Sequence, residues 1–285
     1  MKYVYLTVLI SFSSLVNSQD YVQLDFPGAT STMVLGVNLS GAVSGTFTAS
    51  NGNRYGFVLN QQGIFRTIDV DNASYTRATA VNRHSGVAGD YLDNSGNSRA
   101  FTMQLNVNDK KTIMFPDAIG TRAFGMNARG DIAGQYEDIN GQVHGFRLNR
   151  TEYRSVDYPD AVTTIARDVN NSGDVVGEYM DVAGIKHGFF LRNGVYARID
   201  YPNAIATWAT GISNRRDIVG TFRDSIGSHG FWMRAGSYTT MDFPGATSTV
   251  VMDLNEDGVI VGYFIDDVGD THGFIYKKQV VATGR

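Results

Sequence analysis

The chain has 285 residues, a formal net charge of −4 at pH 7 and no cysteine. Hydrophobic residues make up 42% of it, so it can bury a substantial core, and its stability has to come from burial and backbone pairing because no disulfide can form. The acidic excess is small and both signs are dispersed. This argues against a nucleic-acid partner and against an anionic membrane surface, since either would need a basic face.

The first 18 residues have the pattern of a secretory signal peptide. Lys2 is followed by an apolar run from Tyr3 to Ile10, and small residues precede the expected cleavage site. The run is too short and too often interrupted by serine to span a bilayer. We therefore expect a secreted, extracellular protein without membrane insertion, with one domain over residues 19–279 and a tail over residues 280–285.

A repeat with a period in the low forties runs through the rest of the chain. Its clearest marker is a phenylalanine that follows a small residue, in six copies separated by 44, 45, 43, 42 and 43 residues. The copies are Phe57, Phe101, Phe146, Phe189, Phe231 and Phe274. The block DFPGATST occurs twice, at Asp25 to Thr32 and at Asp242 to Thr249. A period of this length is typical of propellers, in which each repeat is one small antiparallel sheet.

Each copy contains four strand-like pieces separated by turn-forming clusters, and none has a sustained helical period. In the fourth copy the pieces are Tyr153 to Asp157, Thr164 to Asn170, Asp174 to Met180 and His187 to Leu191. Stacking such sheets radially buries both of their faces. We therefore predict an all-β fold, a six-bladed β-propeller of four-stranded antiparallel blades. A linear β-solenoid is the competing interpretation, but solenoid repeats are usually shorter and gain nothing from matching ends.

The first strand, Tyr21 to Asp25, precedes every other strand of the mature chain. It is expected to pair beside Gly273 to Tyr276 and to complete the last blade, which closes the ring and hides the exposed sheet edges. The inner strand of each blade would then begin with threonine and end with asparagine or serine. These strands are expected at Thr32 to Asn38, Thr76 to Asn82, Thr121 to Asn127, Thr164 to Asn170, Thr207 to Ser213 and Thr249 to Asn255.

Short elements within the repeat carry a family resemblance. Four copies place histidine before Gly-Phe, at His144, His187, His229 and His272. Together with segments such as Gly211-Ile212-Ser213 and Asp217-Ile218-Val219-Gly220, the chain resembles the HAF-type extracellular repeat family, with glycine where that family has alanine. Tyr55 and Arg99 replace the histidine in the first two copies. The resemblance implies secretion and a propeller, and it brings no established activity.

Several residues suggest chemistry that the repeat explains more simply. The four histidines would lie far apart around the ring, so we predict a structural role, such as a hydrogen bond to a neighbouring blade's backbone, and not a metal ring. The Arg-Gly-Asp triplet at Arg129 to Asp131 coincides with a turn that recurs in other copies. The recurrent Asp-x-x-Gly turns lack the run of oxygen ligands and the closing glutamate of a calcium loop.

The better functional signal lies in inner-strand positions that the six copies do not share. Arg77, Arg122 and Trp208 occupy the second position, and Arg167 occupies the fourth. We predict that they offer charge and an aromatic platform to a polar ligand on the face formed by the crossover and Asp-x-x-Gly loops. The alternative is plain packing between blades, with the arginine heads at the rim.

Two functions of different class follow from these residues. The first is a secreted, non-catalytic binding or adhesion module, expected to be a monomer without a cofactor, whose ligand is an extracellular glycan or protein. The second is a calcium-dependent hydrolase of the lactonase or esterase type, in which Asp168 and Asp253 reach an axial ion. No inner-strand glutamate supports the second, and no GxSxG, HExxH or phosphate-loop motif is present.

Overall fold

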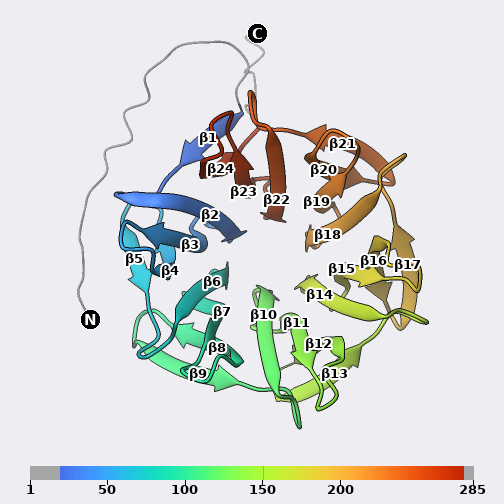
Figure 1. Ribbon diagram of the computed structural model, residues 1–285, viewed down its shortest axis with the longest axis horizontal. Helices are drawn as coiled ribbons and strands as arrows, with labels where there is room; N and C mark the ends of the chain where they lie inside the picture. Colours follow the sequence, from blue (N-terminus) through green and yellow to red (C-terminus); the bar gives the residue numbers. More distant parts are fainter. Residues whose placement is uncertain (1–19, 150, 279–285) are drawn as a thin grey trace.

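The computed structural model describes residues 20–149 and 151–278. The predicted signal peptide and C-terminal tail lie outside the described residues. The described residues form 24 β-strands, and they include no helix that is long and apolar enough to cross a membrane. The strands are arranged around a central axis as a β-propeller (Figure 1).

The strands fall into four layers from the axis outward (Figure 1). The innermost strands are β2 (Ala29–Val37), β6 (Tyr75–Val81), β10 (Gly120–Met126), β14 (Thr163–Val169), β18 (Ala206–Ile212) and β22 (Ser248–Leu254). The second layer is β3 (Val43–Ala49), β7 (Gly86–Leu92), β11 (Ile132–Glu137), β15 (Val175–Met180), β19 (Ile218–Arg223) and β23 (Ile260–Ile265). The third layer is β4 (Arg54–Leu59), β8 (Ser98–Gln104), β12 (Val143–Asn149), β16 (Lys186–Arg192), β20 (Ser228–Arg234) and β24 (Thr271–Tyr276). The outer layer is β1 (Tyr21–Leu24), β5 (Phe65–Ile68), β9 (Asp109–Ile113), β13 (Glu152–Val156), β17 (Val195–Ile199) and β21 (Ser237–Met241).

The all-β propeller is as predicted, but the prediction of six separate blades is wrong. Backbone pairing gives four separate four-stranded blades and one eight-stranded sheet formed by β2 to β9. The eight-stranded sheet arises because Arg54, at the start of β4, pairs in parallel with Tyr75, at the start of β6. We call each set of four consecutive strands a repeat unit, so that units 1 and 2 share this sheet.

The ring is closed by the N-terminal strand, as predicted. β1 pairs antiparallel with β24, with Tyr21 opposite Tyr276 and Leu24 opposite Gly273 (Figure 1). The backbone N–H of Lys277 donates to the carbonyl of Asp20 at 2.7 Å. Unit 6 therefore consists of β22, β23, β24 and the strand from the other end of the chain.

The threonine that opens each inner strand fixes the preceding crossover. In unit 4 the Thr164 hydroxyl accepts a hydrogen bond from the backbone N–H of Tyr158 at 3.0 Å. The same bond, over six residues, recurs at Thr32, Thr76, Thr121, Thr207 and Thr249. All six threonines are buried, so each hydroxyl satisfies an N–H that would otherwise lack a partner.

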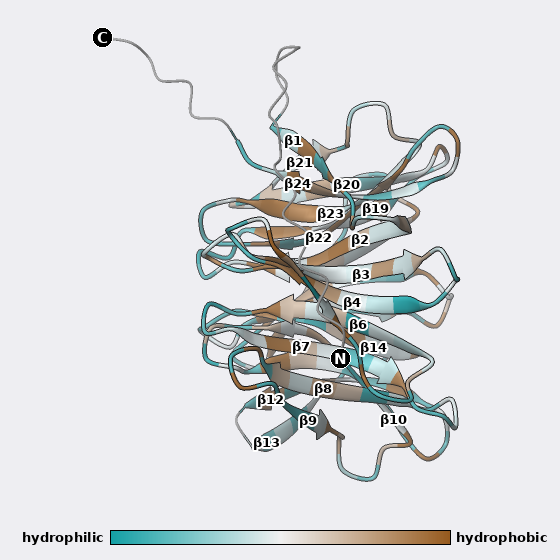
Figure 2. Cartoon of the chain, turned by 90° about the vertical axis from the view of Figure 1, so that its left-hand side faces the viewer, coloured by the Kyte–Doolittle hydropathy of each residue, from teal (hydrophilic) through white to brown (hydrophobic). Residues whose placement is uncertain are grey.

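The repeated phenylalanine forms the centre of each unit. All six are fully buried, and hydrophobic residues are concentrated on the strands (Figure 2). In unit 4 the ring of Phe189 lies against Gly177, where an added Cβ would come within 2.7 Å of the ring and 2.0 Å of the carbonyl oxygen of Ile165. The repeat therefore needs glycine in the second layer because the phenylalanine occupies the space of a side chain.

Candidate functional site

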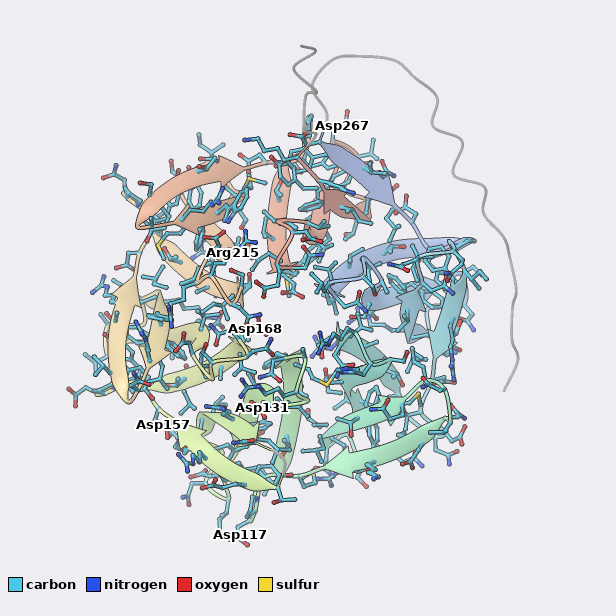
Figure 3. The ribbon with its side chains drawn as sticks, turned by 180° about the vertical axis from the view of Figure 1, so that it is seen from behind. Asp117, Asp131, Asp157, Asp168, Arg215 and Asp267 are labelled. Carbon is cyan, nitrogen blue, oxygen red and sulfur yellow. The ribbon has the colours of Figure 1, made fainter. Side chains whose placement is uncertain are left out.

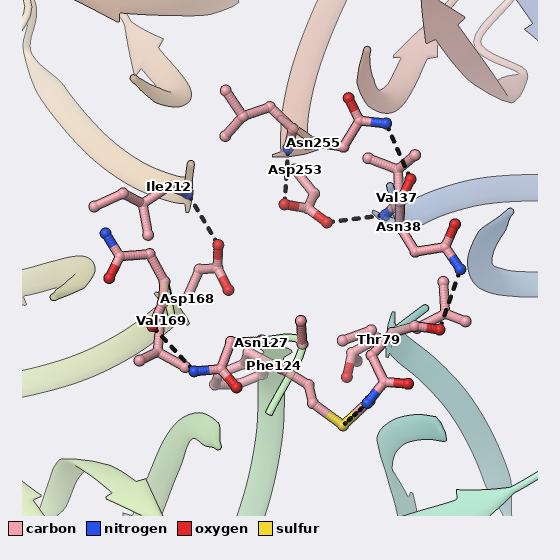
Figure 4. A pocket seen from close by; sticks show the side chains of 18 of the residues that line it. Val37, Asn38, Thr79, Phe124, Asn127, Asp168, Val169, Ile212, Asp253 and Asn255 are labelled. Carbon is pink, nitrogen blue, oxygen red and sulfur yellow. Dashed lines mark hydrogen bonds between the residues drawn. The ribbon is translucent and has the colours of Figure 1, made fainter. Parts of the chain in front are cut away.

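The candidate site is a cavity of about 280 Å³ on the propeller axis. Its walls are the C-terminal halves of the six inner strands and the turns that follow them (Figure 4). Successive strands of a unit are antiparallel, so these turns lie at the end of the propeller opposite the crossover and Asp-x-x-Gly loops. The cavity therefore opens on the face opposite the one that we predicted to bind ligand.

A β-bulge places one side chain from every unit in the cavity. Each inner strand skips one residue in its pairing with the second layer, always at its fourth position. The six skipped residues all line the cavity, and they are Leu35, Thr79, Phe124, Arg167, Thr210 and Met252. Bulges redirect side chains and are common beside binding sites. The fourth position, one of the two that vary between the copies, thus faces the cavity in every unit.

Two carboxylates line the cavity at the position that follows the bulge, Asp168 in unit 4 and Asp253 in unit 6. Asp253 accepts hydrogen bonds from the backbone N–H groups of Val37, at 2.9 Å, and Leu254, at 2.7 Å. Asp168 accepts one from Ile212 at 2.9 Å (Figure 4). Burial raises the pKa of Asp168 to about 7, and burial together with the charge of Asp168 raises the pKa of Asp253 well above its ordinary value. Figure 3 shows Asp168 near the axis, far from the rim residues Asp117, Asp157 and Asp267.

Amide side chains line the cavity mouth and join neighbouring units. The Asn255 side chain donates to the carbonyl of Asn38 at 2.9 Å, and Asn38 in turn donates to the carbonyl of Asn82 at 3.1 Å (Figure 4). Asn127 donates in the same way to Asn170 at 3.0 Å. The asparagine that ends most inner strands therefore bridges adjacent units, which the sequence pattern alone did not indicate.

Arg167 reaches the cavity from the bulge of β14. Its guanidinium lies 4.7 Å from the ring centre of Phe124 and donates to the buried Glu178 at 3.1 Å. Arg77 also lines the cavity, although it stands at the second position of its strand. It is held by two hydrogen bonds to Asp90, at 3.0 and 2.9 Å, and Asp90 is fully buried. Bidentate pairing of this kind fixes the guanidinium in one orientation.

The other two predicted ligand-binding residues lie away from the cavity. Arg122 donates to the hydroxyl of Ser98 at 2.8 Å, and Trp208 lies under the ammonium group of Lys186 at 6.0 Å. Neither residue lines the cavity. The structure thus brings Arg77, Arg167 and both carboxylates together, and it separates them from Arg122 and Trp208.

The four repeated histidines do have structural partners, but the predicted partner was wrong. His187 Nδ1 lies 2.9 Å from Asp200 and its Nε2 lies 3.3 Å from Asp181. His144, His229 and His272 have the same pair of carboxylates within their own sheet. The partners are side chains and not a neighbouring blade's backbone. Where Arg99 replaces histidine, it pairs with the equivalent Asp93 at 2.9 Å.

Three carboxylates line the cavity, Asp168, Asp253 and Glu256, and Glu256 accepts a hydrogen bond from the backbone N–H of Asn214 at 2.9 Å. Among the described residues, no group of three or more His, Asp or Glu side chains is arranged to hold a metal ion. The site in the calcium hypothesis would rest on Asp168 and Asp253, which already accept backbone hydrogen bonds. Asp131 of the Arg-Gly-Asp triplet is buried, so the turn and not an exposed loop accounts for that triplet.

Comparison with known proteins supports the propeller fold. The chain matches no protein-family model and no curated protein sequence. It is similar in fold to AofleA from Arthrobotrys oligospora, at 12% identity and a TM-score of 0.60 over 95% of this chain and 90% of that one. The Aleuria aurantia lectin, solved with Fucα1-6GlcNAc, gives 8% identity and a TM-score of 0.54 over 90% and 93%. TolB from Acinetobacter baumannii gives 11% and 0.59, and the match spans 65% of its length. At these identities the similarity is one of fold, and membership of the HAF-type family stays a prediction.

Proposed function

We propose that the protein is a secreted, non-catalytic binding module whose axial cavity takes a small polar ligand, such as one sugar residue of a glycan. The proposal rests on the six bulge residues that line the cavity. At this one position of the repeat, the six inner strands present five residue types to the same cavity. A position that serves only packing should hold similar residues in every unit, whereas a binding site needs different groups at defined places.

The cavity chemistry supports a hydroxyl-rich ligand. Asp168, Asp253 and Glu256 provide acceptor oxygens, Arg77 and Arg167 provide donors, Thr79 and Thr210 provide hydroxyls, and Phe124 provides an aromatic surface. Sugar rings present both hydroxyl groups and apolar C–H faces, so such a mixture suits them. The volume of about 280 Å³ is near the lower limit for small-molecule sites, which favours a single ring over an extended chain.

The lectin similarity gives independent support of a limited kind. One solved structure with this fold is described as a fucose-specific lectin from Aleuria aurantia. With 8% identity the likeness extends to the fold only. It supports the class of ligand in our proposal, a carbohydrate, without selecting the sugar.

A glycan-array screen followed by titration of the best monosaccharide tests the proposal. Met252→Trp should block the cavity and abolish binding, and Asp253→Asn should weaken it about tenfold through the loss of an acceptor oxygen. Arg122→Ala and Trp208→Ala are the matched controls outside the cavity and should bind normally. Loss of binding in the controls with retention in Met252→Trp would move the site to the opposite face.

The calcium-dependent hydrolase is a second candidate because Asp168 and Asp253 both face the axis. A calcium ion would have to be held by these carboxylates together with neighbouring oxygens, since calcium takes six to eight oxygen ligands. Calcium titration of the melting temperature distinguishes the two functions. A rise in melting temperature that Asp253→Asn removes would support the hydrolase, and no shift would leave the binding module as the better account.

A further inference from the structure

The face opposite the axial cavity has an unequal distribution of exposed aliphatic side chains. This face is built from the six crossovers and the six turns between the second and third layers. Four turn tips carry strongly exposed aliphatic side chains: Ile139 at 74%, Val182 at 86% and Ile226 at 86% in units 3, 4 and 5, and Val268 at 77% in unit 6. In units 3, 4 and 5 the adjoining crossover residue is exposed and aliphatic as well, Ile119, Val162 and Ile205, whereas in unit 6 it is Thr247. We call the six residues of units 3, 4 and 5 the apolar arc.

Each crossover residue of the apolar arc lies beside the turn of the same unit. The backbone N–H of Ile119 donates to the carbonyl of Glu137 at 2.9 Å, immediately before the turn that holds Ile139. Val162 and Ile205 make the corresponding bonds to Met180 and Arg223, at 2.8 and 2.7 Å. Units 3, 4 and 5 follow one another around the ring (Figure 1). The apolar arc therefore extends over three adjacent units, with a crossover residue beside a turn tip in each.

The fold does not require these aliphatic residues. Units 1 and 2 form the same turns with polar tips, Ser50 and Asn51 in one and Asn94 and Ser95 in the other. The turn of unit 2 closes with the same backbone bond as that of unit 3, between Asp93 and Asn97 in the first and between Asp138 and Gln142 in the second. Turn formation is thus equally served by polar tips, and side chains this exposed contribute little to packing. A surface of this kind marks an interaction site.

The apolar arc is surrounded by negative charge. The six loops that carry it contain seven aspartates and no lysine or arginine. They are Asp117, Asp138, Asp157, Asp160, Asp181, Asp200 and Asp224. Backbone hydrogen bonds within the turns lower the pKa of Asp138, Asp181 and Asp224, so these three are anionic at neutral pH. Lys186 and Arg223 lie next to the turns, but the aspartates outnumber them, so the charge around the apolar arc stays negative.

We propose that the apolar arc docks a protein segment that presents apolar and basic side chains together. Charge complementarity selects this occupant. A second copy placed face to face would bring two sets of aspartates together, and an anionic lipid surface would be repelled in the same way. A cationic amphipathic helix satisfies both features of the surface, because its apolar stripe covers the aliphatic tips while its lysines meet the surrounding carboxylates. This inference concerns the opposite face from the axial cavity and does not depend on the ligand proposed for it.

Fluorescence anisotropy with synthetic peptides tests the proposal. An amphipathic Leu/Lys helix should bind the full mature chain and weaken as salt rises, whereas a Lys/Gln peptide of equal charge and a Leu/Glu peptide should not bind. The triple variant Ile139→Asn, Val182→Asn, Ile226→Ser installs the polar residue types of units 1 and 2. It should bind the Leu/Lys peptide at least about tenfold more weakly, since several exposed aliphatic contacts are lost.

The matched control places the same change on the other face. Val107 and Val195 are exposed there, and Val107→Asn with Val195→Asn should leave peptide binding unchanged. Equal loss in both variants, or no loss in the triple variant, would overturn the proposal. Sedimentation velocity tests whether a second copy of the chain occupies the arc. Self-association of the wild type that the triple variant abolishes and the control variant retains would assign the arc to a second copy instead.

Discussion

At the scale of single residues, the axial carboxylates depend on the space that neighbouring units leave for them. Asp168 follows a unit with Gly125 at the equivalent position, and Asp253 follows one with Gly211. A Cβ added at Gly125 would come within 2.4 Å of an oxygen of Asp168, and one at Gly211 within 2.9 Å of the Cα of Asp253. Large and small residues thus alternate around the axis. Burial of two carboxyl groups in this confined space raises the pKa of both.

The raised pKa of Asp168 predicts how stability changes with pH. In the unfolded chain this carboxyl ionises near its ordinary value, and in the folded protein it keeps its proton to about pH 7. Between these values the folded state binds more protons, so its stability falls as pH rises. The free energy of unfolding of Asp168→Asn, measured relative to the wild type, should therefore increase from about pH 4 to about pH 7, by up to about 1.4 kcal/mol per pH unit.

Urea unfolding at several pH values measures this difference. Asp267→Asn, an exposed aspartate at the rim, is the control and should give a difference that is nearly flat across the same window (Figure 3). A flat difference for Asp168→Asn as well would mean that the axial carboxyl ionises normally in the folded protein.

At the scale of elements, the bulged inner strand explains which site residues could be predicted from the sequence. The variation at the fourth position is visible in the aligned copies, but the bulge that turns this position toward the axis has no sequence signature of its own. Arg77 and Arg122 share the second position, and only Arg77 lines the cavity. Their directions differ because one pairs with the buried Asp90 and the other with Ser98, and these partners lie on other strands.

The second-layer strand is the element least tolerant of substitution. Gly177→Ala would place a methyl group 2.0 Å from the carbonyl of Ile165 and 2.7 Å from the ring of Phe189, both in the centre of unit 4. Neither the backbone nor the buried ring can move away, so we expect a loss of at least about 4 kcal/mol or failure to fold. Thermal unfolding provides the measurement.

Gly120→Ala, in β10 of unit 3, is the matched control. The nearest atom to an added Cβ there is 3.7 Å away, so the change should alter the free energy of unfolding by no more than about 0.5 kcal/mol. Comparable losses at both glycines would show that strand propensity, and not the phenylalanine, demands glycine in the second layer.

At the scale of the whole molecule, the repeat determined the strand order and the closure, but not the number of separate sheets. The spacing of the six phenylalanines and the duplicated DFPGATST block were sufficient to predict β1 beside β24. The merging of units 1 and 2 depends on one backbone approach, between Arg54 and Tyr75. A single bridge between neighbouring strands reflects small differences in backbone position, and residue types do not encode differences of that size.

In unit 6 the outer strand, β1, comes from the other end of the chain, so no turn connects it to β24, the strand with which it pairs. Tyr21 secures this pairing, with its ring 4.9 Å from that of Tyr276 and 5.6 Å from that of Phe274. Tyr21→Ala should lower the free energy of unfolding by about 2 to 4 kcal/mol and should also free β1 from β24. Amide hydrogen exchange should then accelerate along β24, because its edge becomes accessible.

Tyr153→Ala separates closure from simple loss of packing. Tyr153, in β13, is the equivalent tyrosine of unit 3, and its ring lies 6.1 Å from that of Phe146. A similar loss of stability is expected, but β13 is tied to β12 by a short turn, so exchange along β12 should rise much less than exchange along β24 does in Tyr21→Ala. If both variants gave the same local acceleration, the N-terminal strand would be an ordinary outer strand, and the identity of the two chain ends would need an explanation other than closure.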